Sequence, residues 1–155
     1  MNAVRYKYMN KSIKIPIFLL RLTLGWIFFY AGITKILNPE WSAAAFLQKA
    51  KTFPLFFQWL ANSQNIDWVN FLNSWGPFLI GISLILGALV RWSSLAGILL
   101  MILYYLPAFD FPYAGSNSYL IDQHIIYILV LLLLYRIHAG QIWGLDAILR
   151  KTKAI

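Results

Sequence analysis

Four long apolar runs divide the 155 residues of this chain, and the first of them carries charge inside it. The run from Ile15 to Leu37 is long enough to cross a bilayer, yet it contains Arg21 and Lys35. An ionisable side chain at membrane depth costs at least about 3 kcal/mol, so it usually faces protein or a polar cavity. These two charges therefore constrain both the fold and the function.

Composition places the chain among integral membrane proteins. It is 61% hydrophobic and only 12% charged, which is well outside the usual range of soluble domains. We predict an all-α membrane four-helix bundle that forms a single domain over residues 1–155, with the lipid bilayer as its surroundings. The predicted spans cover about 15–37, 68–90, 93–109 and 119–137.

Charge and cysteine content exclude several other classes. The net charge is +8, but the basic residues lie beside the apolar runs, which favours contact with the membrane surface over nucleic acid. The chain has no cysteine, so disulfides, thiolate metal sites and iron–sulfur ligation are excluded on it. Persulfide chemistry on the chain itself is excluded for the same reason.

Between the first two spans lies an aromatic-rich segment, 40–65. It predicts amphipathic pieces at the membrane interface, broken near Pro54, and a small packed cap outside the membrane is an equally weighted alternative. In the second span, Pro77 predicts a kink or a break. Residues 91–93 are expected to link the second and third spans as an antiparallel hairpin. Small residues would let these two helices approach closely, among them Gly81, Gly87 and Gly97.

Orientation follows from the distribution of basic residues. If the N-terminus is inside, the inner face holds Arg5, Lys7, Lys11, Lys14, Arg91, Arg136, Arg150, Lys151 and Lys153. The outer side holds only Lys35, Lys49 and Lys51, with the acids Glu40, Asp67, Asp110 and Asp122. The positive-inside rule therefore predicts that both termini are cytoplasmic.

Helical periodicity places the two charges of the first span on one stripe. At 100° per residue, Gly25, Gly32 and Lys35 each lie within about 40° of Arg21, and the two charges are about 21 Å apart along the axis. This stripe is expected to face protein or a polar cavity, because the rest of the helix is apolar. Alternatively, both cations snorkel to opposite interfaces.

The fourth span carries a second polar group near its outer end. His124 and Tyr127 lie there with Asp122, which we expect to be the counter-ion of Lys35. The alternative for Asp122 is a place at the N-terminus of the helix, where the dipole favours an acid. His124 and His138 are about 21 Å apart on one helix and cannot clamp one haem iron.

No metal or haem is predicted, because suitable ligand spacing is missing. A quinone fits better as electron acceptor, since its pocket needs an apolar slot, hydrogen-bond donors and a proton route. The expected quinone- or substrate-binding residues are Arg21, Lys35 and Arg91. The expected proton-handling, catalytic residues are Asp122, His124 and Tyr127.

Three motifs, taken in order, resemble the DoxX/DoxD family of small four-helix membrane proteins. They are Leu20-Arg21 with Gly25, Gly32 and Lys35; LGALVRWSSLAG, which contains Gly87 and Arg91; and IWGLDAIL, which contains Trp143–Asp146. The sequence YLID at 119–122 is similar to the DoxD-type branch, the large subunit of thiosulfate dehydrogenase (quinone). Many members carry a Glu early in the second span, where this chain reads Leu79-Ile80-Gly81.

The resemblance implies a membrane subunit of a quinone-linked oxidoreductase in a prokaryotic inner or plasma membrane, with thiosulfate as a candidate reductant. It also implies a second subunit or a redox partner protein. A non-catalytic scaffold that recruits such a partner, and a small-anion carrier, are the alternatives. Homo-oligomerisation stays open.

Overall fold

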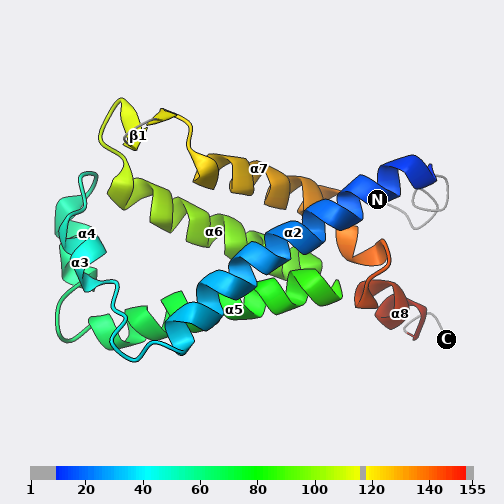
Figure 1. The fold of residues 1–155 in the computed structure, drawn as a ribbon, viewed down its shortest axis with the longest axis horizontal. Coiled ribbons are helices and arrows are strands. Elements are labelled where there is room, and N and C mark those ends of the chain that lie inside the picture. The colour runs from blue at the N-terminus through cyan, green and yellow to red at the C-terminus, as the bar shows by residue number, and fades with distance from the viewer. Residues whose placement is uncertain (1–9, 116–117, 153–155) are drawn as a thin grey trace.

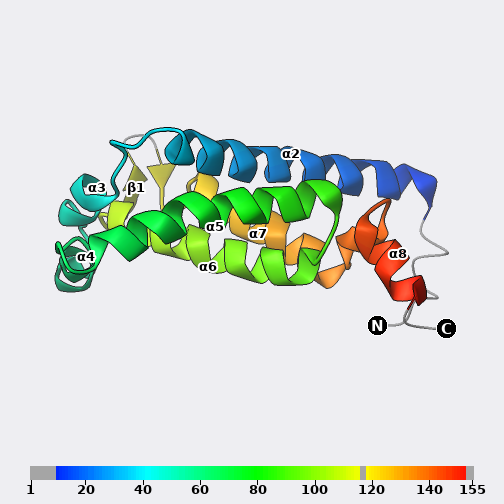
Figure 2. The same cartoon turned by 90° about the horizontal axis from the view of Figure 1, so that it is seen from below.

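The computed structural model describes residues 10–115 and 118–152, and the main elements in this part of the chain are helices (Figures 1 and 2). Four of them form the body: α2 (Lys11–Ile36), α5 (Ile66–Leu86), α6 (Val90–Ala108) and α7 (Gln123–Arg136). Helices α2, α5 and α6 are long and apolar enough to cross a membrane, whereas α7 has only 14 residues. The prediction of an all-α membrane fold is confirmed. The fourth span is shorter than predicted.

The shortening of the fourth span has a local cause. Strands β1 (Tyr113–Gly115) and β2 (Ser118–Tyr119) pair in antiparallel fashion. Asp122 then caps α7, because its side chain accepts hydrogen bonds from the backbone amides of His124 and Ile125. The helix therefore begins at Gln123, not at Tyr119 as predicted.

The two ends of the bundle are built differently (Figure 2). One end carries α3 (Ala44–Gln48), α4 (Pro54–Leu60) and the two β strands; we call it the Lys35 end. The opposite end carries the α5–α6 turn, the short 3-10 helix η1 (Ala139–Gln141) and α8 (Leu145–Thr152); we call it the Arg21 end. The start of α2 and helix α8 share this end, as the predicted topology requires.

The compartment at each end stays a prediction. Arg5, Lys7 and Lys153, which contribute to that prediction, lie outside the described residues.

Close packing of α2 on α5 is the dominant helix contact, and it depends on glycine. A Cβ atom at Gly32 would collide with the backbone of Phe78, and one at Gly81 would collide with the backbone of Phe29. Gly25 faces Leu84 and Ile85 in the same way. The absence of side chains at these positions lets the two backbones touch.

This arrangement corrects the predicted role of the glycines in the second and third spans. Gly81 packs against α2 and Gly97 packs against Leu131 of α7, so neither brings α5 and α6 together. Gly87 lies in the turn between those helices with φ +69°, a conformation that glycine adopts without strain. The turn therefore spans residues 87–89, and residues 91–93, predicted to be the link, form the first turns of α6.

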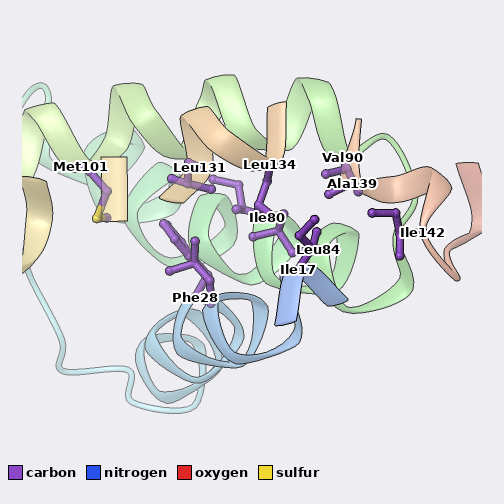
Figure 3. Close-up of a cluster of buried hydrophobic side chains, with 11 residues drawn as sticks. Ile17, Phe28, Ile80, Leu84, Val90, Met101, Leu131, Leu134, Ala139 and Ile142 are labelled. Atoms are coloured by element: carbon purple, nitrogen blue, oxygen red, sulfur yellow. The ribbon is translucent and has the colours of Figure 1, made fainter. Parts of the chain in front are cut away.

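Helix α5 is continuous from Ile66 to Leu86 although it contains Pro77, so the predicted break does not occur. Pro77 is buried inside the bundle. Beside it, a cluster of large apolar side chains from all four helices fills the bundle (Figure 3); its members include Phe28, Leu84, Leu131 and Leu134. This core holds the two ends at a fixed separation.

The segment between α2 and α5 folds into a small cap with a core of its own. Leu47 and Phe57 are buried there with Ala43, Ala61 and Val69. Helix α4 begins at Pro54, where the predicted break falls. The segment is therefore packed, as the cap alternative predicts, and its position relative to the membrane stays a prediction. The outer side of the cap is still aromatic, with Phe46, Phe53, Phe56 and Trp59 exposed.

Much of the outer surface of the long helices is also apolar. About a third or less of each span is buried within the protein, and side chains such as Trp26, Phe71 and Leu99 are exposed. A soluble monomer rarely exposes such a continuous apolar surface. This surface suits contact with lipid.

Candidate functional site

Lys35, in the last turn of α2, reaches inward at one end of the bundle. Its Nζ atom donates to the backbone oxygen of Asn73 at 3.2 Å and to the hydroxyl of Tyr104 at 3.1 Å. The ammonium also lies 4.6 Å from the ring centre of Trp41 and 5.1 Å from that of Tyr104. Such cation–π contacts stabilise a charged amine. The half-buried side chain of Lys35 thus faces protein.

Asp122 is not the counter-ion of Lys35, so this prediction is wrong. Its carboxylate caps α7 and lies 2.5 Å from Nδ1 of His124. The predicted alternative, a carboxylate at the helix N-terminus, is confirmed. Among the described residues, no carboxylate forms an ion pair with Lys35. Asp122 and Lys35 lie at the same end of the bundle, as predicted. The Asp122 carboxylate, however, points toward its own helix and not toward Lys35.

Lys35 lines a cavity of about 270 Å³, which we call the polar cavity because it is the more polar of two adjoining cavities. Tyr104 and His124 line it from α6 and α7, and their rings meet edge to face at 6.3 Å. Its other walls come from α5 and from the segment that leads into the cap, namely Trp41, Ser42, Ala43, Phe46 and Asn73. An amine, a phenol and an imidazole therefore converge on one small space.

A second, apolar cavity of about 350 Å³ adjoins the first. The two share four lining residues: Ala43, Phe46, Asn73 and Tyr104. The apolar cavity runs between the cap and the α5–α6 pair as far as Ile80 and Ala96. Together, the two spaces could hold an amphiphile with its polar head beside Lys35 and its tail along the helices.

Two of the expected proton-handling residues are arranged around this site. His124 lines the polar cavity, and the carboxylate of Asp122 contacts Nδ1 of its ring. Such a carboxylate fixes the orientation of an imidazole. Tyr127 lines neither cavity. It packs instead against the apolar core of the bundle.

Arg21 lies at the opposite end and is almost fully buried, with 1% of its surface exposed. Its guanidinium donates to the carbonyl oxygens of Ala139 and Ile142, at 2.7 and 2.9 Å, and to that of Trp143 at 3.4 Å. We call this arrangement the Arg21 clamp. Arg21 does not snorkel; it holds the chain that follows α7.

Residues from all three sequence motifs meet at the Arg21 clamp. Gly87 and Gly144 touch one another and the guanidinium, and a Cβ on either would collide with both. Asp146 accepts hydrogen bonds from the amides of Leu89 and Val90, so it caps α6 from a distance in sequence. The motifs thus close the Arg21 end by packing and hydrogen bonding.

The expected binding residues are therefore not brought together. Arg91 contacts Tyr135 near the Arg21 end, with 3.2 Å between its Nη2 atom and the phenol oxygen. It is exposed there. Of Arg21, Lys35 and Arg91, only Lys35 lines a described cavity.

Sequence reasoning missed Tyr104, Trp41 and Asn73 as site residues. Tyr104 interrupts an apolar run near the outer end of the third span, at the depth expected for Lys35 and His124. The shared depth of these three residues is the signal in the sequence that could have identified Tyr104. The contact of Asn73 uses its backbone oxygen, which no side-chain pattern reveals.

No group of three or more potential metal ligands occurs among residues 10–115 and 118–152. An amine, a phenol and an imidazole line the polar cavity at the Lys35 end. The fold and the cavities together define a small polytopic membrane protein with two adjoining cavities at one end.

Comparison with protein families identifies the particular group. The DoxX family model matches residues 17–108, which is more than half of the chain. The protein therefore belongs to the DoxX family. No curated protein and no solved structure matches the chain. The matched segment includes both ends of the first stripe, Arg21 and Lys35, and most of the residues that line the two cavities.

Proposed function

We propose that the protein is the membrane subunit of a quinone-linked oxidoreductase, with quinone bound at the Lys35 end. The observation that carries this proposal is that the two cavities adjoin and share four lining residues, Tyr104 among them. A quinone has a polar ring and an apolar tail, and the adjoining spaces offer a more polar and an apolar part. Quinone pockets need both, together with hydrogen-bond donors for the ring oxygens.

The chain's own groups would supply the binding and the proton. Lys35 and Tyr104 can donate to one ring oxygen, and His124 can face the other. Reduction of a quinone to a quinol takes up two electrons and two protons. The Asp122–His124 pair is suited to pass protons, because an imidazole can both accept and donate a proton and the carboxylate fixes its orientation.

The electrons would come from outside this chain. We propose a reduced sulfur compound, such as thiosulfate, oxidised at a partner subunit that delivers electrons to the bound quinone. The similarity of YLID at 119–122 to the DoxD-type branch supports this choice of reductant. Under the positive-inside rule, the Lys35 site would lie on the outer side of a prokaryotic inner or plasma membrane, with both termini cytoplasmic.

Quinone binding by the purified protein in neutral lipid nanodiscs tests the proposal. A short-tailed quinone should bind saturably, and Lys35→Met should weaken its binding while Lys49→Met leaves it unchanged. Lys49 is a matched control because it is exposed on the cap at the same end. Reduction of that quinone on addition of thiosulfate and the partner subunit would then identify the reductant.

Two results would count against the proposal. Absence of saturable quinone binding by the folded protein contradicts the quinone site itself. Binding without any quinone reduction, when thiosulfate and the partner are present, contradicts only the proposed reductant.

A non-catalytic scaffold that recruits a redox partner is the second candidate. It is favoured by the Arg21 clamp, where the family-like motifs serve architecture. If the scaffold is correct, Lys35→Met, Tyr104→Phe and His124→Gln should all preserve the activity of the assembled complex. Loss of activity with intact assembly would exclude it.

A further inference from the structure

The charge of Lys35 is held only by neutral groups. Its ammonium contacts a backbone oxygen, a phenol and two aromatic rings. A half-buried cation that lacks an opposite charge is poorly stabilised, because its partial loss of water is not offset by a nearby anion. The cavity beside it is the place where such an anion would fit.

The acids at this end are committed elsewhere or lie outside the cavity. Asp122 is occupied by the first amides of α7 and by His124. Asp110 lies 3.9 Å from Lys51, and both side chains are exposed. Glu40 and Asp67 line neither cavity. Within the described residues, therefore, the cavity holds a positive charge that no carboxylate neutralises.

We infer that the Lys35 site selects quinones whose ring oxygens carry negative charge, with ionised hydroxyquinones as the stable representatives. The inference rests on the proposed function and specifies its ligand class. A hydrogen bond from an ammonium to an anionic oxygen is shorter and roughly twice as strong as one between neutral groups. The apolar cavity supplies the second half of the recognition by holding an alkyl tail.

A consequence follows for the bound quinone. A site that binds the anionic form more tightly than the neutral form shifts the equilibrium toward the anion by that difference in affinity. The semiquinone and quinolate anions that form during reduction belong to the favoured class. Lys35 would thus ease the addition of an electron to quinone at this site.

A matched pair of probes tests this selectivity. The first is a 3-alkyl-2-hydroxy-1,4-naphthoquinone, which is ionised at neutral pH; the second is its neutral 2-methoxy analogue with the same tail. Affinities are measured in nanodiscs of neutral lipid, with empty nanodiscs subtracted. We expect the hydroxy probe to bind about tenfold more tightly or better. The extra free energy of a charge-assisted hydrogen bond over a neutral one corresponds to about that factor in affinity.

Variants assign the selectivity to Lys35. Lys35→Met should bring the two probes to equal affinity, Lys35→Arg should keep most of the preference, and Lys49→Met should keep all of it. If Lys35→Met does not fold, the arginine variant and Tyr104→Phe still test the site. Tyr104→Phe should weaken both probes and preserve the preference, since it removes a neutral donor and leaves the charge.

Each remaining outcome decides the question. Equal binding of both probes to the unmodified protein overturns the inference and leaves the proposed quinone function standing. A preference that survives in folded Lys35→Met also overturns it. Failure of both probes contradicts the proposed function as well. Oleate serves as a non-quinone anion, and if it displaces the hydroxy probe with equal or higher affinity, the site recognises anionic amphiphiles in general and the quinone assignment fails.

Discussion

Each end of this bundle holds one inward-facing cation of α2, and the surroundings of the two cations differ. Arg21 is buried, whereas Lys35 is half-buried. At the Arg21 end, the guanidinium has three backbone acceptors, and two glycines and the chain after α7 enclose it. At the Lys35 end, the ammonium has two neutral oxygen partners and borders a cavity. At the Arg21 end, the cation binds the chain after α7 and is enclosed by it. At the Lys35 end, the cation lines a cavity.

The difference separates architecture from chemistry on a single helix. Arginine suits the closed end, because its planar group can serve several carbonyl oxygens at once. Lysine suits the open end, because its compact charge can be shared with a ligand. Between them, Gly25 and Gly32 pack against α5. The stripe on α2 is therefore two sites joined by a packing seam.

Removal of the Arg21 charge should have the largest effect on stability. Arg21→Met leaves buried carbonyl oxygens without donors and should lower the free energy of unfolding by about 2–4 kcal/mol. Arg21→Lys should recover only part of this loss, because one amine cannot serve the same set of acceptors. Reversible unfolding in mixed detergent measures both. Equal stability of Arg21→Met and the unmodified protein would remove the distinction between the ends.

The second-largest loss of stability is expected from a wider contact between α2 and α5. Gly32→Ala pushes a methyl group into the backbone of α5 and should cost about 1–3 kcal/mol. Gly76→Ala is the matched control on α5, since a Cβ there has no neighbour within 4 Å. The control should be neutral or stabilising by up to about 1 kcal/mol, because alanine favours a helix. The same unfolding assay compares the pair, and similar losses for both would contradict the packing argument.

Loss of the long-range cap on α6 should have a smaller effect at the Arg21 end. Asp146→Ala removes the acceptor for the amides of Leu89 and Val90 and should cost about 1 kcal/mol. Asp146→Asn should retain most of the stability, because asparagine is also a good cap. Hydrogen exchange at these two amides checks the mechanism. Unchanged protection in Asp146→Ala would contradict the cap.

The smallest effect on stability is expected at the Lys35 end. Lys35→Met removes two hydrogen bonds but also an uncompensated charge, so we expect a change of less than about 1 kcal/mol. Quinone affinity should nevertheless fall strongly in the same variant. A loss of stability as large as that of Arg21→Met would mean that both ends are structural, and the comparison would fail.

The sequence predicted the class of fold, the stripe on the first span and the break at Pro54, because these depend on apolar length, helical period and local chain chemistry. It failed where direction around the bundle matters. Asp122 matches Lys35 in depth, but its carboxylate turns toward the amides of its own helix. Gly87 is predicted to bring the second and third helices together, but it lies in the turn between them and packs against Gly144 and Arg21.

The candidate site was predictable only in part for the same reason. Lys35 and His124 stand out as polar residues within apolar runs, so the sequence identified them. Tyr104 does not stand out, because tyrosine is common near membrane interfaces. The cavities exist only because the cap packs over α5 and α6, which is a tertiary contact that no local pattern encodes.

The central claim, that ligand binds at the Lys35 end and not at the Arg21 end, is tested most directly by photolabelling. A quinone with a diazirine next to its ring is irradiated with the protein in nanodiscs, and the labelled peptides are mapped by mass spectrometry. We predict label on residues that line the polar cavity, such as Trp41, Asn73 and Tyr104, and its loss on competition with unlabelled quinone. Competable label confined to residues 139–146 would contradict the account.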